Sequence, residues 1–176
     1  MARTEEFIAR LIEALGPKGV STDPQEIAPH LQDWRGRWQG STPVLVKPAS
    51  TEEAARAMAL CAEYGLAVTP QGGNSGMVNG SIPYGEVLVS LKRMNRVREV
   101  DTLNDAMTLE AGVILTRAQE VAEENGRLFP LSLGAEGVAT IGGLISTNAG
   151  GVAVLRYGMM RDLVLGIEAV LPDGRV

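Results

Sequence analysis

The sequence predicts an α+β fold with mixed sheets, and three patterns support this class. Apolar residues recur at helical spacing in some segments, while short runs rich in β-branched residues occur in others. Glycine and proline separate these segments. A strand, a helix and a second strand also follow one another between residues 44 and 69, at the length that a right-handed crossover needs. We therefore expect short strands that pair in more than one direction.

The first half of the chain contains two amphipathic helices. The first should span Glu5–Leu15 and end at Gly16-Pro17, and an irregular, extended lead-in segment should follow it from Val20 to Pro43. The second should run to about Tyr64, because Ser50 and Glu53 have the spacing of a capping box and Gly65 terminates the pattern. Predicted strands at Val44–Val46 and Leu66–Thr69 flank this second helix.

The second half should contain further short strands and one more helix. The predicted strands are Val87–Val89, Val97–Val100, Met107–Ala111 and Ile167–Leu171, and the predicted helix is Thr116–Asn125. Pro172-Asp173-Gly174 predicts a tight turn after which a returning strand would begin, so we expect the fold to be C-terminally truncated. The predicted organisation is an N-terminal helix and lead-in segment at 1–42, a first subdomain at 43–100 and an incomplete second subdomain at 101–176.

Composition excludes several classes of function. The 176 residues carry a net charge of -5, so the chain has no excess of positive charge that would attract nucleic acid or an anionic membrane. With one cysteine and one histidine, an internal disulfide and a zinc-type metal site are not expected, and a cytoplasmic setting fits. Gly137–Leu155 has no charge and approaches the length of a membrane span, but its glycines and polar residues favour a buried ligand loop instead.

Most of the unusual residues of the first half lie in an uncharged, glycine-rich stretch, Thr69–Gly80, directly after a predicted strand. Glycines let successive backbone N–H groups point into one concavity, which binds phosphate oxygens through fixed dipoles rather than through lysine or arginine. A pyrophosphate group is the ligand that this hypothesis favours. An ordinary glycine-rich turn is an equally good interpretation of the composition, because neither the Rossmann fingerprint nor the Walker loop is present.

A second, nearly neutral region covers Leu128–Gly151, in which Glu136 is the only charged residue. Its Gly-Gly pairs would let the backbone approach a flat ligand closely, and hydroxyl and amide side chains offer neutral hydrogen bonds. This composition suits a dinucleotide with a planar ring.

The two regions, in this order, resemble the FAD-binding domain of the vanillyl-alcohol-oxidase superfamily, most closely its D-lactate, glycolate and D-2-hydroxyglutarate dehydrogenase branch. The residues that carry the resemblance are Pro70–Gly76, Pro130–Gly134, Ile141–Gly143, Thr147–Gly151, Arg156–Gly158 and Leu165–Glu168. The resemblance implies a two-subdomain FAD-binding fold in which the first loop holds the pyrophosphate and the second region lines the flavin and adenosine. Asn74 stands where many members carry the histidine that attaches flavin covalently, so it also implies non-covalent FAD.

The resemblance and the glycine patterns together predict the following cofactor-binding residues: Pro70, Gln71, Gly72, Gly73, Asn74, Ser75, Gly76, Met77, Pro130, Ser132, Leu133, Gly134, Thr140, Gly142, Gly143, Ser146, Asn148, Ala149, Gly150, Gly151, Tyr157, Gly158 and Ile167.

No residue of this chain is predicted to be catalytic. His30 has no visible orienting partner, and Cys61 should be a packed side chain of a helix. The aromatic and basic segment Trp34–Trp38 is open to two interpretations, a contact with a partner or packing along the surface.

We therefore expect the FAD-binding portion of a dehydrogenase that oxidises a D-2-hydroxy acid to the 2-oxo acid by hydride transfer to FAD. The resemblance places substrate binding in a C-terminal domain beyond this chain. The expected partners are FAD and a small 2-hydroxy acid, with no nucleic acid and no membrane span, and a homodimer is one assembly consistent with this function. Two alternatives stay open: a non-catalytic FAD-holding subunit completed by another chain, and an aryl-alcohol oxidase of the same superfamily.

Overall fold

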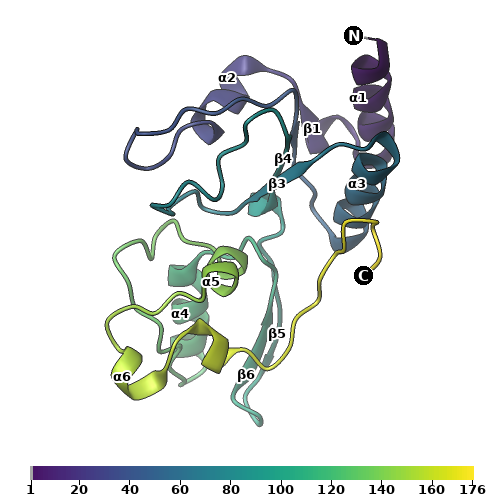
Figure 1. Ribbon diagram of the computed structural model, residues 1–176. Coiled ribbons are helices and arrows are strands. Elements are labelled where there is room, and N and C mark those ends of the chain that lie inside the picture. The colour runs from purple at the N-terminus through teal and green to yellow at the C-terminus, as the bar shows by residue number, and fades with distance from the viewer. Residues whose placement is uncertain (1) are drawn as a thin grey trace. The chain divides into compact units, whose positions relative to one another are not determined.

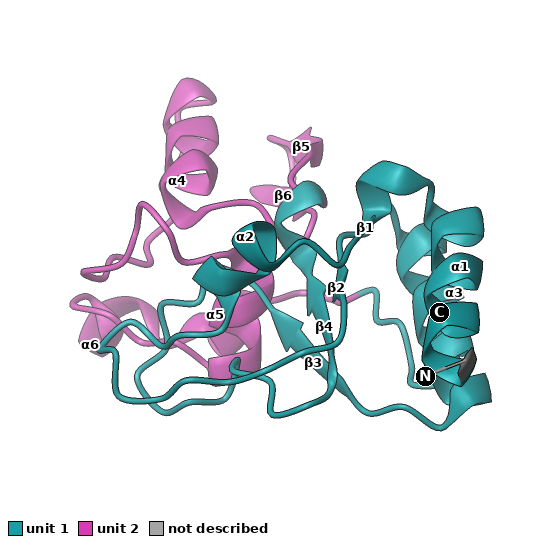
Figure 2. Ribbon diagram, turned by 90° about the horizontal axis from the view of Figure 1, so that it is seen from above, with its two compact units in different colours: residues 1–93, 168–176 teal, residues 94–167 magenta. Residues whose placement is uncertain are grey.

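The computed structural model describes residues 2–176 and divides them into two compact units (Figures 1 and 2). Unit 1 comprises the chain up to Arg93 together with Glu168–Val176, and unit 2 comprises Met94–Ile167. Unit 1 therefore contains both the N-terminal part of the chain and its C-terminal nine residues, 168–176. Each unit has its own cluster of buried apolar side chains.

Unit 1 is built on a mixed four-stranded sheet in the order β1-β2-β4-β3. Its strands are β1 (Val20–Ser21), β2 (Leu45–Val46), β3 (Val68–Gln71) and β4 (Val87–Ser90). β1 is antiparallel to β2, whereas β2 and β3 both run parallel to β4, so the mixed sheet expected from the sequence is confirmed. β4 lies between the two strands that flank the second predicted helix and is buried along its whole length.

Two helices, α1 (Ala2–Leu15) and α3 (Thr51–Tyr64), lie side by side and build the core of unit 1 (Figure 1). Phe7 and Leu11 of α1 are fully buried, and the ring of Phe7 lies 5.2 Å from the ring of Tyr64. Cys61 is packed in the same core, where burial raises the pKa of its thiol to about 11. Its predicted role as an inert packed side chain agrees with this environment.

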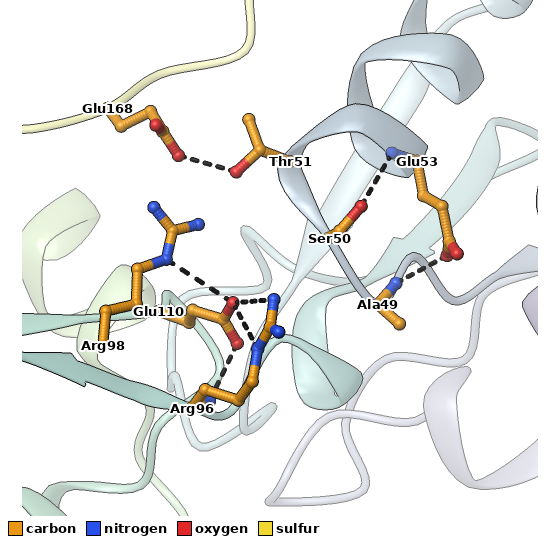
Figure 3. A network of polar contacts seen from close by, with 8 residues as sticks. All are labelled: Ala49, Ser50, Thr51, Glu53, Arg96, Arg98, Glu110 and Glu168. Carbon is orange, nitrogen blue, oxygen red and sulfur yellow. Dashed lines mark hydrogen bonds and ion pairs between the residues drawn. The ribbon is translucent and has the colours of Figure 1, made fainter.

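The capping pattern predicted for α3 is present in the structure (Figure 3). The Ser50 hydroxyl accepts a hydrogen bond from the Glu53 N–H at 3.2 Å, and the Glu53 carboxylate accepts one from the Ala49 N–H at 2.8 Å. The carboxylate thus reaches one residue further back than the usual box. At the other end, Gly65 adopts φ 66° and ends the helix as predicted.

The lead-in segment is more structured than the sequence suggested. It contains the short helices α2 (Pro24–Ile27) and η2 (Ala28–His30) besides strand β1, and a further short helix, η1 (Pro17–Gly19), directly precedes it. α2 begins there because the Asp23 carboxylate accepts a hydrogen bond from the Gln25 N–H at 2.9 Å and proline occupies the first helical position. The prediction of a purely extended segment overlooked this N-cap.

Unit 2 combines a two-stranded antiparallel hairpin with short helices. Its elements are β5 (Val97–Asp101), β6 (Ala106–Leu109), α4 (Leu115–Glu124), α5 (Ile141–Thr147), α6 (Val154–Tyr157) and η4 (Met160–Leu163), and η3 (Leu91–Arg93) precedes it at the end of unit 1. The hairpin and α4 agree with the sequence prediction. Val113, Leu115 and Leu131 are among the fully buried side chains of the core of unit 2.

A buried carboxylate follows β6 and pairs with the hairpin (Figure 3). The Glu110 side chain has no exposed surface, and it accepts hydrogen bonds from the Arg96 side chain at 2.8 and 3.0 Å and from the Arg96 N–H at 2.8 Å. Burial by itself would raise the pKa of Glu110, but the Arg96 hydrogen bonds and the charges of Arg96 and Arg98 outweigh it and hold the pKa below its ordinary value.

The glycine-rich stretch Gly137–Leu155, predicted to be a buried ligand loop, nevertheless contains helix α5. Gly142 fits there because its backbone packs on Ala111, whose carbonyl accepts the Gly142 N–H at 2.8 Å. A Cβ at Gly142 would lie only 2.8 Å from the Cβ of Ala111. Close packing thus offsets the low helix propensity of glycine. Among the described residues, no helix is long and apolar enough to span a membrane.

The last segment returns to α3 in unit 1, and it does not form the strand predicted at Ile167–Leu171. The Thr51 hydroxyl donates to the Glu168 carboxylate at 2.6 Å (Figure 3), and the predicted tight turn is confirmed by a hydrogen bond from the Gly174 N–H to the Leu171 carbonyl at 2.9 Å. A Cβ at Gly174 would lie 2.6 Å from the carbonyl oxygen of Ala55. Contact with a helix has therefore replaced strand pairing.

We expect Ser50→Ala to lower the free energy of unfolding by about 1 kcal/mol, because it removes the acceptor for the Glu53 N–H. Urea denaturation of the wild type and the variant measures this difference. Ser50→Asp, which retains a capping oxygen, is the matched control and should stay close to the wild type. Equal stability of the alanine variant and the wild type would show that the cap contributes nothing.

Candidate cofactor-binding site

The first predicted loop leaves the sheet of unit 1 at the end of β3, and Gln71 closes its base. The Gln71 side chain is buried, and its amide donates to the carbonyl of His30 at 2.9 Å and to the carbonyl of Ser81 at 2.8 Å. Its carbonyl oxygen lies 2.5 Å from Nδ1 of His30. Gln71 was predicted to bind the cofactor, but its side chain joins the two ends of the loop to η2.

His30 therefore has a partner that the sequence did not reveal. Burial lowers the pKa of His30, and the hydrogen bond with Gln71 acts in the opposite direction without cancelling this effect. A neutral imidazole with Nδ1–H donating to the Gln71 carbonyl oxygen satisfies this geometry. The histidine contacts Gln71 at the base of the loop, and it is half-buried.

Two asparagines shape the loop itself. Asn74 has φ 54°, donates its amide to the Gln32 carbonyl at 2.8 Å and accepts the Ser81 hydroxyl at 2.8 Å. Asn79 has φ 63° and donates to the Tyr84 hydroxyl at 2.8 Å, while its carbonyl oxygen is buried without a hydrogen-bond partner. Asparagine tolerates this left-handed backbone better than most residues. The two side chains thus fix turns that glycine was expected to supply.

The backbone of this loop leaves donors available. Among the described residues, none of the N–H groups from Gly73 to Gly80 donates to a protein acceptor. A Cβ added at Gly76 or Gly80 would meet no atom within 4 Å, so there is open space beside the backbone at both positions. Free, successive N–H groups on a braced loop form the kind of site that binds phosphate oxygens.

In unit 2, the structure brings together two of the predicted cofactor-binding segments. The Val152 N–H donates to the carbonyl of Ser132 at 2.9 Å, and Gly151, with φ 88°, approaches the same carbonyl so closely that no Cβ could fit there. The N–H groups of Gly150 and Gly151 have no protein acceptor among the described residues. The glycine pair is therefore needed for close contact between loops and still offers donors.

Helix α5 carries one unsatisfied polar atom at its start. Thr140, the N-cap residue, is 2% exposed, and its hydroxyl oxygen has no hydrogen-bond partner. Ser146 and Thr147 instead donate their hydroxyls to the carbonyls four residues earlier, at 2.8 and 3.0 Å. Of the three hydroxyls, that of Thr140 is the one without a hydrogen-bond partner in the protein.

Four other predicted cofactor-binding residues lie between the end of α5 and the end of unit 2. The Asn148 side chain accepts the Arg161 N–H at 2.9 Å, and Gly158 has φ 78° and lies against the Asp162 carboxylate. Ile167 is 70% exposed and belongs to no helix or strand. Tyr157 is partly exposed, with the Arg156 guanidinium 5.3 Å from its ring centre.

Of the remaining predicted residues, Pro70 belongs to strand β3, and the others lie in the same loops or in and just after α5: Gly72, Ser75 and Met77 in unit 1, and Pro130, Leu133, Gly134, Gly143 and Ala149 in unit 2. The predicted site residues are thus divided between the units. Their assignment to the cofactor, and the domain limits 1–42, 43–100 and 101–176, stay predictions.

A loop that the sequence left open, Asp33–Trp38, lies beside the first glycine loop. The buried Asp33 carboxylate accepts the N–H groups of Arg35, Arg37 and Trp38 at 3.0, 2.6 and 2.8 Å. Burial opposes ionisation, but these three hydrogen bonds and the charge of Arg37 lower the pKa of Asp33 below its ordinary value. Aspartate followed by a glycine-containing turn is the signal by which this loop could have been recognised.

The donor set fits a dinucleotide that carries a diphosphate. Unit 1 offers free N–H groups beside glycines with open space, and unit 2 offers the buried Thr140 hydroxyl and two free glycine N–H groups. Both sets are uncharged hydrogen-bonding groups of the kind that binds a phosphate or the polar edge of a ring system. FAD would use both.

These features define an FAD-binding protein, and comparison with known families agrees. The model of the FAD binding domain family matches residues 42–176. The chain belongs to this family, and the predicted resemblance and the FAD cofactor are confirmed.

Known proteins with similar sequences include 2-hydroxy acid dehydrogenases. The chain is 44% identical over 174 residues to the mitochondrial D-2-hydroxyglutarate dehydrogenase of Bos taurus, covering 98% of this chain and 32% of the relative. It is 41% identical over 157 residues to a putative mitochondrial D-lactate dehydrogenase of Schizosaccharomyces pombe, covering 89% of this chain and 30% of the relative. The chain thus spans about a third of the length of these relatives.

A solved structure of an alkyldihydroxyacetonephosphate synthase has the same fold. It matches with a TM-score of 0.83 and 22% identity, over 91% of this chain and 32% of that protein. At this identity the similarity concerns the fold alone.

The cytoplasmic setting expected from the sequence is wrong by this comparison. The bovine and fission-yeast relatives are both named as mitochondrial proteins. The expectation rested on cysteine content, which reports a reducing environment and does not distinguish between compartments that share one.

Gly151→Ala should destabilise the protein by about 1–3 kcal/mol, because it places a Cβ against the Ser132 carbonyl at a left-handed φ. Thermal and urea unfolding measure the loss. Gly137→Ala is the matched control, since a Cβ at Gly137 meets nothing within 4 Å, and it should change stability by less than about 0.5 kcal/mol. The same stability for both variants would contradict the assigned contact.

Proposed function

We propose that this chain is the FAD-holding part of a dehydrogenase that oxidises a D-2-hydroxy acid to the corresponding 2-oxo acid. The observation that carries the proposal is the 44% identity to bovine D-2-hydroxyglutarate dehydrogenase over 98% of the chain. A putative D-lactate dehydrogenase with 41% identity supports the same substrate class. The bound FAD would supply the acceptor for the hydride that leaves C2 of the substrate.

The contribution of this chain would be to bind and orient the cofactor. The loop from Gly73 to Gly80 would hold the diphosphate through its free N–H groups, with Gln71 and Asn74 keeping those groups in place. The Thr140 hydroxyl and the N–H groups of Gly150 and Gly151 would bind polar edges of the flavin or the adenosine. We assign no catalytic side chain here, and we propose that substrate binding and proton removal belong to sequence beyond these 176 residues.

FAD should be held without a covalent bond. Asn74, at the position where the resemblance implies a flavin-linked histidine in many members, has an amide side chain that is not a nucleophile. Both ends of that amide are also occupied, by the Gln32 carbonyl and the Ser81 hydroxyl. Nδ1 of His30 is hydrogen-bonded to the Gln71 side chain at the base of the loop.

Acid precipitation of the FAD-loaded protein should therefore release all of the flavin into the supernatant, since no bond to a side chain survives to retain it. Absorbance of the supernatant near the flavin maximum, compared with that of the dissolved pellet, measures the partition. Free FAD mixed with denatured protein is the control. Yellow colour that stays with the washed pellet would disprove the non-covalent mode.

The substrate class is tested on the complete protein by following reduction of an artificial electron acceptor. We expect turnover of D-2-hydroxyglutarate, D-lactate or glycolate and none of 4-hydroxybenzylic alcohols, because the relatives with more than 40% identity are named for hydroxy acids. The L-enantiomers of 2-hydroxyglutarate and lactate are the matched controls, since glycolate is achiral. Turnover of the benzylic alcohols alone would instead identify an aryl-alcohol oxidase, and FAD binding without any turnover would favour a cofactor-holding subunit.

A further inference from the structure

The first glycine loop contains no charged residue, yet a cation from another loop reaches it. Nη2 of Arg35 lies 3.1 Å from Sδ of Met77, and the Asn74 amide donates to the Gln32 carbonyl two residues before Trp34. The two loops therefore contact each other at two points, and they lie side by side in the ribbon diagram (Figure 1). Both belong to unit 1.

The guanidinium of Arg35 is held in position but not neutralised. Its backbone N–H is bound by the buried Asp33 carboxylate, which fixes the turn, while its exposed side chain forms no ion pair with any described residue. Arg37 is also exposed and forms no ion pair with any described residue, but its guanidinium has no contact with the glycine loop. Of the two arginines, Arg35 is the one whose guanidinium lies against the loop.

An unmatched cation beside a row of free N–H groups is suited to an anion. Thioether sulfur is only a weak acceptor, so the contact with Met77 uses little of the hydrogen-bonding capacity of a guanidinium with five N–H donors. A phosphate oxygen would accept far stronger, charge-assisted hydrogen bonds. The chain carries a net charge of -5, so a local positive charge would also offset the repulsion that a doubly charged diphosphate meets.

We propose that Arg35 binds the FAD diphosphate, supplying from the loop Asp33–Trp38 the positive charge that the glycine loop lacks. This proposal rests on the proposed function, because it names a further ligand of the same cofactor. It also departs from the expectation that the diphosphate is held by backbone dipoles without arginine.

The test compares Arg35→Gln with Arg37→Gln, which remove the same charge from the same exposed turn. FAD is titrated into each apo protein and flavin fluorescence is followed. Arg35→Gln should weaken FAD binding by about ten-fold or more, the size expected for a charge-assisted hydrogen bond, whereas Arg37→Gln should change it by less than about two-fold. Equal effects of the two variants, or no effect of Arg35→Gln, would overturn the proposal.

Riboflavin, which has no phosphate, identifies the anion that is bound. Its affinity should be the same for Arg35→Gln and the wild type, and the ten-fold loss should appear only with FAD. A loss with riboflavin as well would mean that Arg35 shapes the site rather than contacting phosphate, which contradicts the proposal. Unchanged FAD affinity with a raised KM for the hydroxy acid would show that the anion is the substrate carboxylate.

The proposed function fails in a distinguishable way. If the wild-type protein binds neither FAD nor riboflavin, the assignment of the fold as a working cofactor site is wrong, and the role of Arg35 falls with it. Circular dichroism and the thermal unfolding midpoint of both variants should match those of the wild type, since neither guanidinium is buried.

Discussion

The side-chain amide of Gln71 is the interaction on which the first loop depends. It joins the carbonyl of Ser81, at the end of the loop, to the carbonyl of His30 in the preceding short helix. A buried amide with all its bonds made to protein is expensive to leave unsatisfied, so the loop ends are held together firmly. The N–H groups between them can then remain unpaired without the loop collapsing onto its own carbonyls.

In unit 2, close packing at glycines holds neighbouring segments together. A Cβ at Gly142 would lie 2.8 Å from the Cβ of Ala111, and a Cβ at Gly151 would collide with the carbonyl oxygen of Ser132. The glycines of this region are therefore needed first for contact within the protein and only then for approach by a ligand. This explains why a segment of low helix propensity still forms α5, since the packing energy of a buried helix outweighs propensity.

Sequence patterns located most helices and strands but did not reveal what several polar side chains contact within the protein. The helix ending at Tyr64 followed from Ser50, Glu53 and Gly65, because capping depends on neighbouring residues. Gln71 and Asn148 are predicted to contact the cofactor, and the structure adds that their side chains bind protein backbone that is distant along the chain or across a turn. Glycine content alone could not separate these two uses of a polar residue.

The amino-acid sequence by itself determined the α+β class, the two neutral glycine-rich regions and the relation to FAD-binding domains, since periodicity, capping and motif order are local properties. Only the tertiary structure decided which polar groups remain free for a ligand. That depends on contacts between residues far apart in the chain. His30 is hydrogen-bonded to Gln71, Nη2 of Arg35 contacts Sδ of Met77, and the Thr140 hydroxyl has no hydrogen-bond partner. Hydrogen bonding is satisfied in space, and spacing along a sequence does not encode which donors are left over.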